Sequence, residues 1–342
     1  MVVSPMTLKT IYQEMKDALK EAGVETPALD ARIIIEERAG LDWSDIVAKG
    51  DEIEISDGLC EQMRRDVSER INGKPLSRIY NRREFWGMDF ALCPDTLDPR
   101  PDTELIIELA LKRFEGRKPP ERILDLGTGS GCILISLLSE FPEARGVGID
   151  LSEGALEMAQ YNAGQNGCLG RVEFMHGSWW DALYTVLPSF NDESVQSLRR
   201  LRAAARGLNA PYTHSDSIDQ NRCDAQNGAA KTVHNAQHKF DLIVSNPPYI
   251  ANQVIPTLSD EVKNHDPILG LDGGADGLDA YKIILSRLNE HLSEHGITLL
   301  EIGYDQENDV MRLSKESRFA LRTVHNDLAG NPRVVDISRG DK

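Results

Sequence analysis

Hydrophobic residues recur at helical spacing through the first part of the chain. From Leu8 to Ala22 they fall on every third or fourth position, which predicts an amphipathic helix capped by Thr7 and ended by Gly23. Three further apolar segments with stop signals follow, around 29–39, after Ser44 and over 59–71. The pattern therefore predicts a small helical bundle over residues 1–72.

A short aromatic stretch follows this bundle. Residues 73–81 are polar and predict a connector, whereas residues 84–92 (EFWGMDFAL) are short, aromatic and interrupted by a glycine, which is typical of a β-hairpin. We expect residues 73–98 to join two domains. The segment from Pro99 to Glu104 is then expected to open a helix.

From Arg122 onward, strand-like and helical segments alternate along the chain. The strand-like segments are 122–127, 145–150, 171–177, 240–246 and 296–303, and helical patterns lie between them. Such alternation predicts a parallel sheet covered by helices on both faces. We therefore expect residues 99–342 to form one α/β domain.

One stretch interrupts this alternation. Residues 188–237 are polar and hold few large apolar groups, so we expect an insertion that contributes little to the fold. Its basic cluster is typical of a solvated face rather than of a polyanion site, and it consists of Arg199, Arg200, Arg202 and Arg206. His234 and His238 lack carboxylate or thiolate partners at ligand spacing, so no metal site is predicted.

Composition narrows the possible partners. The 342 residues include 38 basic and 55 acidic side chains, a formal net charge of −17, and such a surface repels phosphate backbones unless it carries a local basic stripe. We therefore expect no direct nucleic-acid partner. No apolar run reaches the roughly 18 residues that span a bilayer, and residues 1–7 do not resemble a signal peptide. These features predict a cytoplasmic protein without membrane contact.

The first motif that carries chemistry is the glycine-rich segment from Asp125 to Gly131 (DLGTGSG). It lies between an apolar strand and an apolar helix, where its glycines let the backbone turn tightly and approach a ligand. The predicted cofactor-binding residues are Gly127, Thr128, Gly129, Ser130 and Gly131. A dinucleotide site is the alternative, but it favours the spacing G-x-G-x-x-G, so nicotinamide is the second choice.

Two more side chains follow predicted strands. Asp150 ends the strand over 146–150, and a carboxylate there can accept hydrogen bonds from both hydroxyls of a ribose. Trp179 follows the third strand in the segment GSWW and is expected to stack on an adenine, with Trp180 as the other candidate.

The deciding motif is Ser245-Asn246-Pro247-Pro248-Tyr249, which follows the apolar strand over 240–244. Two consecutive prolines remove backbone donors, so the loop offers acceptors, namely the side-chain oxygen of Asn246 and the carbonyl of Pro247. Paired acceptors suit an NH₂ group, and Tyr249 adds a flat face for a planar amide or base. Catalysis at such a site depends on alignment and electrostatic stabilisation, without a strong base.

These motifs together resemble the HemK/PrmC family of protein glutamine methyltransferases. The resemblance rests on RPDTE at 100–104, DLGTGSG at 125–131, NPPY at 246–249 and the segment over 266–278, behind a helical N-terminal region. It implies a class I, Rossmann-like methyltransferase fold. It also implies transfer of a methyl group from S-adenosylmethionine to the glutamine amide nitrogen in the Gly-Gly-Gln motif of class 1 peptide chain release factors.

The resemblance also assigns roles to residues. Cofactor binding is implied for the glycine loop over 127–131, Asp150, Trp179 and Asn246. Glutamine binding is implied for Asn246, Pro247, Pro248 and Tyr249, with Asn246, Pro247 and Tyr249 as the catalytic set. The helical bundle over 1–72 is the expected docking domain for the protein substrate.

Three alternatives stay open at this point. A glutamine methyltransferase that acts on a large-subunit ribosomal protein has the same chemistry and differs only in its docking surface. NPPY also occurs in amino-methylating enzymes that act on nucleic acid, which need a basic channel. A non-enzymatic, translation-associated binding module is the third alternative. The chain departs from the compact family pattern in its insertion over 188–237.

Overall fold

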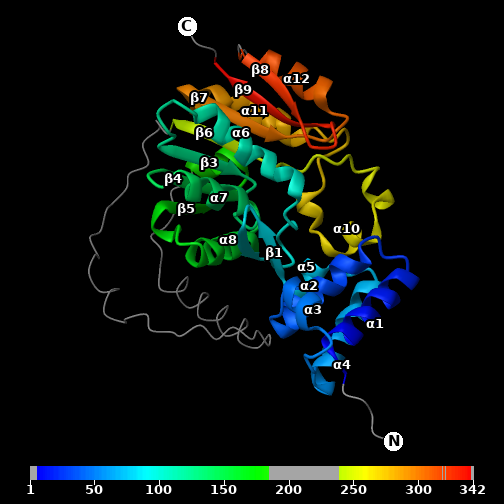
Figure 1. The fold of residues 1–342 in the computed structure, drawn as a ribbon. Coiled ribbons are helices and arrows are strands. Elements are labelled where there is room, and N and C mark those ends of the chain that lie inside the picture. Colours follow the sequence, from blue (N-terminus) through cyan, green and yellow to red (C-terminus); the bar gives the residue numbers. More distant parts are fainter. Residues whose placement is uncertain (1–5, 185–238, 318, 320, 340–342) are drawn as a thin grey trace, which may run out of the picture.

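The computed structural model describes residues 6–184, 239–317, 319 and 321–339. The predicted insertion over 188–237, with its arginine cluster and His234, lies outside the described residues, and so does His238. Figure 1 shows the helical N-terminal region beside a larger part built on a sheet.

Five helices form the N-terminal region: α1 (Leu8–Glu21), α2 (Pro27–Ala39), α3 (Trp43–Lys49), α4 (Asp57–Ile71) and α5 (Leu76–Tyr80). They enclose a hydrophobic core of their own, which includes Leu8, Ile34 and Met63. The predicted cap of the first helix is confirmed, because Thr7 Oγ1 accepts a hydrogen bond from the backbone N–H of Thr10 at 3.3 Å.

One helix of this region begins slightly earlier than expected, and one local prediction was wrong. Helix α3 begins at Trp43 with Asp42 as its cap, because the Asp42 carboxylate accepts from two backbone N–H groups and Ser44 lies inside the helix. The stretch 73–81, expected to be a polar connector, contains α5. That short helix is stabilised by tertiary contacts, since Leu76 and Arg78 are both buried.

The predicted hairpin is confirmed. Strands β1 (Arg82–Phe85) and β2 (Met88–Ala91) pair antiparallel, and Trp86 and Gly87 between them both have positive φ, as a tight two-residue turn requires. Phe85 and Phe90 on the hairpin are fully buried in the core of the larger part. The hairpin therefore packs into the region that follows it in sequence.

A seven-stranded sheet forms the centre of the larger part, in the order β5-β4-β3-β6-β7-β9-β8. Its strands are β3 (Arg122–Leu126), β4 (Arg145–Asp150), β5 (Val172–His176), β6 (Phe240–Ser245), β7 (Leu292–Glu301), β8 (Leu321–Asn326) and β9 (Pro332–Ser338). The first five in that order pair parallel, as predicted. The sheet is not wholly parallel, however, because β9 runs antiparallel to both β7 and β8.

Helices cover both faces of this sheet, as the sequence predicts (Figure 1). They are η1 (Pro101–Thr103), α6 (Glu104–Phe114), α7 (Cys132–Glu140), α8 (Glu153–Gln165), η2 (Leu169–Arg171), η3 (Trp179–Tyr184), η5 (Ile255–Thr257), α10 (Asp260–His265), η6 (Ile268–Gly270), α11 (Asp279–His291) and α12 (Glu307–Glu316). Residues of α6, α7 and α8 share one hydrophobic core, whereas those of η3, α11 and α12 share another. The chain therefore has the Rossmann-like α/β fold expected of a class I methyltransferase.

The strand order creates a crevice. The chain runs from β3 outward through β4 to β5 and then returns to the other side of β3 with β6. At such a switch point the loops at the carboxyl ends of adjacent strands separate, and ligands of open α/β sheets bind there. No helix in the described part of the chain is both long enough and apolar enough to cross a membrane.

Ion pairs join the helical region to the larger part. Asp266 accepts hydrogen bonds from Arg78 of α5 at 2.8 Å and from Arg100, which precedes η1. The side chains of Arg78 and Asp266 are 7% and 3% exposed, so this pair is desolvated. A second contact joins Arg70 of α4 to Glu261 of α10. The loop that follows β6 is thus held against the helical region.

Candidate functional site

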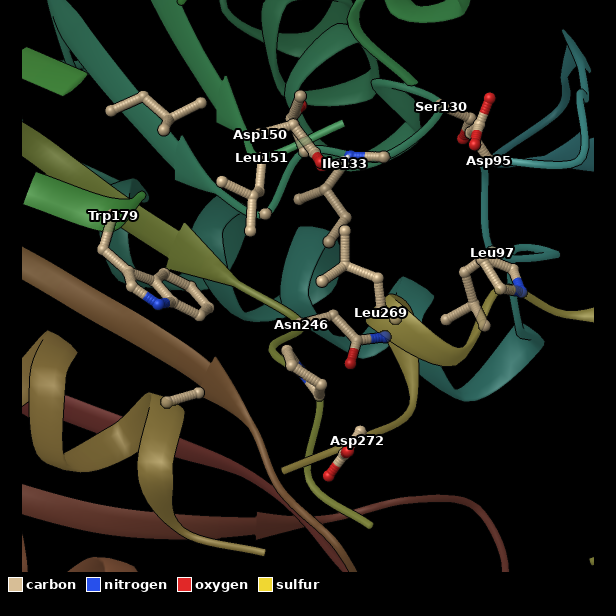
Figure 2. A pocket seen from close by; sticks show the side chains of 18 of the residues that line it. Asp95, Leu97, Ser130, Ile133, Asp150, Leu151, Trp179, Asn246, Leu269 and Asp272 are labelled. Carbon is tan, nitrogen blue, oxygen red and sulfur yellow. Dashed lines mark hydrogen bonds between the residues drawn. The ribbon is translucent and has the colours of Figure 1, made fainter. Parts of the chain in front are cut away.

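A pocket opens at the carboxyl ends of β3, β4 and β6, where the strand order reverses. Figure 2 looks into it, with Trp179 on one side, Leu97 on the other, and Asn246 and Leu269 between them. Its wall therefore includes the glycine loop, two strand ends, the segment before α6 and the loop after β6.

The glycine loop forms one wall of the pocket. Gly127, Gly129 and Gly131 have φ values of 76°, 54° and 80°, a left-handed conformation that side chains with a Cβ rarely adopt. The N–H groups of Gly127 and Thr128 both donate to the carbonyl of Ile149, which fixes the loop to β4. The sequence can form this turn because a glycine occupies each position of the loop that has a positive φ.

Asp150 fixes the loop from the neighbouring strand. Its Oδ2 accepts a hydrogen bond from the N–H of Gly129 at 2.8 Å, and its Oδ1 accepts one from Ser152 at 2.9 Å. Burial raises the pKa of Asp150, while these backbone hydrogen bonds lower it. Each carboxylate oxygen keeps a second lone pair, so the side chain can still accept two ligand hydroxyls.

The two adjacent tryptophans have different environments. Trp179 lines the pocket, and a Cβ atom at Gly127 would lie 3.9 Å from its ring atom Cζ3. Trp180 is 1% exposed, donates its indole N–H to the carbonyls of Ile283 and Ile284, and stacks on His291. Of the two tryptophans, Trp179 alone can therefore contact a ligand in this pocket.

The loop after β6 forms the opposite wall. Ser245 is buried, and its hydroxyl donates to the carbonyl of Leu126, which holds the end of β6 beside β3. Asn246 follows and lines the pocket, and its Nδ2 donates to Thr103 Oγ1 at 3.1 Å. Pro248 also lines the pocket.

The structure gathers most of the predicted site residues around this one pocket. Those on its wall are Gly127, Thr128, Gly129, Ser130, Asp150, Trp179, Asn246 and Pro248. Three others do not line it. Gly131 lies at the start of α7, Pro247 is buried, and the Tyr249 hydroxyl points to Glu301 Oε1 at 3.4 Å.

Two buried carboxyl groups lie behind the pocket. Asp125 is fully buried, and burial raises its pKa to about 7 although Thr128 donates to Oδ2 at 2.7 Å. Burial likewise raises the pKa of Glu301 to about 7, against a hydrogen bond from Thr103 and the charge of Arg333, both of which lower it. In the described residues, no group of three or more His, Cys, Asp or Glu is arranged to hold a metal ion.

Known proteins share this combination of parts. A family model described as the PrmC N-terminal domain matches residues 10–80, and one described as a methyltransferase domain matches residues 123–198. The release factor glutamine methyltransferase of Agrobacterium fabrum is 35% identical, covering 94% of this chain and 93% of its own length. That of Bradyrhizobium diazoefficiens is 37% identical over 97% and 95%. The chain belongs to the release factor glutamine methyltransferase family.

The fold extends beyond this family. Among solved structures, the hMettl16 catalytic domain in complex with MAT2A 3'UTR hairpin 6 is similar with a TM-score of 0.50 and 14% identity. The match covers 81% of this chain and 83% of that one. At this identity the likeness shows a common methyltransferase fold.

Sequence reasoning missed three polar residues that support the NPPY loop of this methyltransferase. Thr103 and Glu301 lie beside Asn246 and Tyr249, as described above. Gln306 donates from Nε2 to the carbonyls of Tyr249, at 2.9 Å, and Gly277, at 3.0 Å. A signal existed for Glu301, because an acidic residue that ends an apolar strand is the same pattern that identified Asp125 and Asp150.

Proposed function

We propose that this chain transfers the methyl group of S-adenosylmethionine to the side-chain amide nitrogen of the glutamine in the Gly-Gly-Gln motif of class 1 peptide chain release factors. The observation that supports this most is the position of Asn246. It lines the same pocket as the glycine loop, Asp150 and Trp179, so a cofactor held by those residues and an amide held by Asn246 would meet in one cavity.

The glycine loop, Asp150 and Trp179 fit an adenosine-bearing cofactor. The glycine loop exposes backbone without Cβ atoms, Asp150 keeps lone pairs for ribose hydroxyls, and Trp179 offers an aromatic face for the base. The bound cofactor supplies a methyl group on a sulfonium sulfur, which departs as a neutral thioether.

The loop that begins at Asn246 suits a primary amide. We infer that Asn246 Oδ1, on the pocket wall, accepts one N–H bond of the substrate glutamine; the carbonyl of Pro247, the residue expected to accept the other, does not line the pocket. Held in this way, the amide nitrogen directs its lone pair at the methyl carbon. The new N–C bond forms as the C–S bond breaks, and one amide proton passes to solvent. Alignment supplies the catalysis, with no strong base required.

The mouth of the pocket suits a protein loop. Leu97, Pro99 and Leu269 line it, and Leu269 and its neighbour Ile268 are 51% and 53% exposed. Exposed apolar side chains around a polar centre are typical of a protein-binding site. We propose that the helical region over 8–80 docks the body of the release factor while its glutamine loop enters here.

A transfer assay tests this function. The full chain is incubated with radiolabelled S-adenosylmethionine and, in separate reactions, a class 1 release factor, ribosomal protein and RNA or DNA. Label is expected on the release factor, at the Gly-Gly-Gln glutamine, and a Gln→Ala release factor should remain unlabelled. Label on ribosomal protein or nucleic acid alone would contradict the proposal. Because release factors act at the ribosome, we also expect this methyltransferase in the cytoplasm.

A further inference from the structure

One buried arginine of the helical region bonds to two separate segments of the larger part. The guanidinium of Arg78, in α5, donates to the carbonyl of Cys93 at 3.0 Å and to that of Thr96 at 2.6 Å. It also donates to Asp266 Oδ1 at 2.8 Å. The two carbonyls belong to residues 93–100, which leave the hairpin, whereas Asp266 begins the segment over 266–272, which follows α10. A single side chain therefore holds both segments.

These two segments meet at the mouth of the pocket. Leu97 directly follows Thr96, Pro267 directly follows Asp266, and both Leu97 and Pro267 line the pocket. The segments also contact each other, because a Cβ atom on Gly270 would lie 3.8 Å from the Cβ of Leu97. Each hydrogen bond of Arg78 therefore ends at a residue that lies at or next to the wall of the mouth.

The position of the 93–100 segment depends on such side-chain contacts. Residues 93–100 form neither a helix nor a strand, so no regular backbone ladder holds them. Helix α5 supplies a second anchor, because the Ser77 hydroxyl donates to Asp98 Oδ2 at 2.7 Å in a buried position.

The anchor at Asp266 is shared between two arginines. Arg100, at the end of the 93–100 segment and on the pocket wall, donates to the other carboxylate oxygen of Asp266. This pair would remain if Arg78 were replaced. Loss of Arg78 should therefore shift the two segments relative to each other without separating them. Water cannot easily take the place of its guanidinium, since the Arg78 side chain is only 7% exposed.

We propose that Arg78 is a positioning residue that sets how the segments over 93–100 and 266–272 face each other, and with this the path by which the substrate glutamine reaches Asn246. The inference rests on the proposed function, in which a glutamine loop enters at this mouth. Arg78 does not line the pocket and acts through the two segments. When alignment supplies the catalysis, a displacement of about 1 Å can lower the rate roughly a hundredfold. The helical region then shapes the pocket as well as docking the release factor.

Variants of two arginines test this role. Arg78→Met removes the three hydrogen bonds and should lower kcat at least about tenfold, while KM for the release factor and Kd for S-adenosylmethionine change less than about threefold. Arg38→Met is the matched control, because both hydrogen bonds of Arg38 lead to Asp66 within the helical region. It removes a partly buried ion pair in the same region, yet kcat should stay within about twofold of the wild type.

A milder variant serves where Arg78→Met does not fold. Arg78→Lys keeps the charge beside Asp266 but replaces the planar, two-nitrogen end of the guanidinium by one ammonium group. It should fold and still lose at least about threefold in kcat. Arg38→Lys is its control and should retain the kcat of the wild type.

A second measurement does not depend on the substrate. Amide hydrogen exchange is followed by mass spectrometry in peptides that cover 93–100 and 266–272. Both segments should exchange faster in Arg78→Met and Arg78→Lys than in the wild type and in the Arg38 variants.

Three results would overturn the inference: unchanged exchange in both segments, a kcat of Arg78→Lys within about twofold of the wild type, or an equal loss of kcat in Arg38→Met. The last would mean that general loosening of the helical region explains the effect. If the wild type labels no release factor, the proposed function fails, whereas faster exchange confined to the two segments would still show that Arg78 positions them.

Discussion

Asp150 accepts the backbone N–H of Gly129 at 2.8 Å, so the residue expected to bind the ribose also holds the glycine loop in place. Both tasks use the same carboxylate. Asp150→Ala should therefore weaken binding of S-adenosylmethionine by about 1.5–3 kcal/mol, the range for hydrogen bonds to a charged group. Isothermal titration calorimetry measures this. Asp150→Asn, which keeps one acceptor oxygen, should lose less affinity, and unchanged affinity in Asp150→Ala would refute the assignment.

The neighbouring tryptophans provide a matched pair of variants. Trp179→Ala should weaken cofactor binding by about 1–3 kcal/mol, the range for stacking of a base on an aromatic ring, with little change in stability. Trp180→Ala should lower the free energy of unfolding by about 3–5 kcal/mol, because it leaves a cavity in the core. Denaturant unfolding and calorimetry on both variants separate the effects. The reverse pattern would show that the adenine binds elsewhere.

Asn246→Ala removes the acceptor expected to hold the substrate amide. Turnover at saturating substrates should fall roughly a hundredfold, because the hydrogen bond orients the nucleophile in the transition state. The melting temperature should change little, since Asn246 lines a pocket. Asn264→Ala, at an exposed position of α10, is the control and should keep full activity. Near-normal turnover in Asn246→Ala would mean that the substrate glutamine binds elsewhere.

The buried carboxyl group of Asp125 makes stability depend on pH. Burial raises its pKa from 3.8 to about 7, so the folded protein keeps a proton there that the unfolded chain has already released. The free energy of unfolding therefore falls as the pH rises from the lower value to the higher one. Asp125→Asn cannot lose this proton. Between about pH 5 and pH 8 the wild type should lose roughly 2–3 kcal/mol more than this variant.

Denaturant unfolding of both proteins at several pH values measures this difference. A constant offset between them is expected from the changed hydrogen bonding around Thr128, and only the pH dependence reports the proton. Asp51→Asn, at a side chain that is 74% exposed, serves as a control and should follow the wild type. Parallel curves for the wild type and Asp125→Asn would show that Asp125 is ionised throughout.

Local patterns predicted the parts of the site that lie within one strand and its following loop. The glycines over 127–131 and the carboxylate of Asp150 are of this kind, because a strand end fixes where the next side chains point. The choice between Trp179 and Trp180 depends on a backbone turn, since Trp179 has a positive φ of 47°. No local pattern in the sequence indicates such a turn at a tryptophan.

Other features depend on contacts between distant residues. Asn246 donates to Thr103, which lies 143 positions away in the chain, so neither RPDTE nor NPPY alone predicts this hydrogen bond. Helix α5 has only five residues, and its Arg78 donates to Asp266, which lies 188 positions further along the chain. The antiparallel edge of the sheet arises from β8 and β9, which form a hairpin beside β7 where a further crossover helix would have given a parallel strand.

The Asp266 pair also determines whether the two regions of the chain can be exchanged. Removing Arg78 should destabilise the protein by less than the about 3–5 kcal/mol typical of a buried charge left without any partner, because Asp266 keeps its ion pair with Arg100. Arg78 belongs to the helical region, whereas its partner Asp266 lies in the segment that follows NPPY. A chimera that carries a foreign helical bundle must therefore bring an arginine to the same point. A foreign bundle without that arginine would therefore disturb the loop that follows β6.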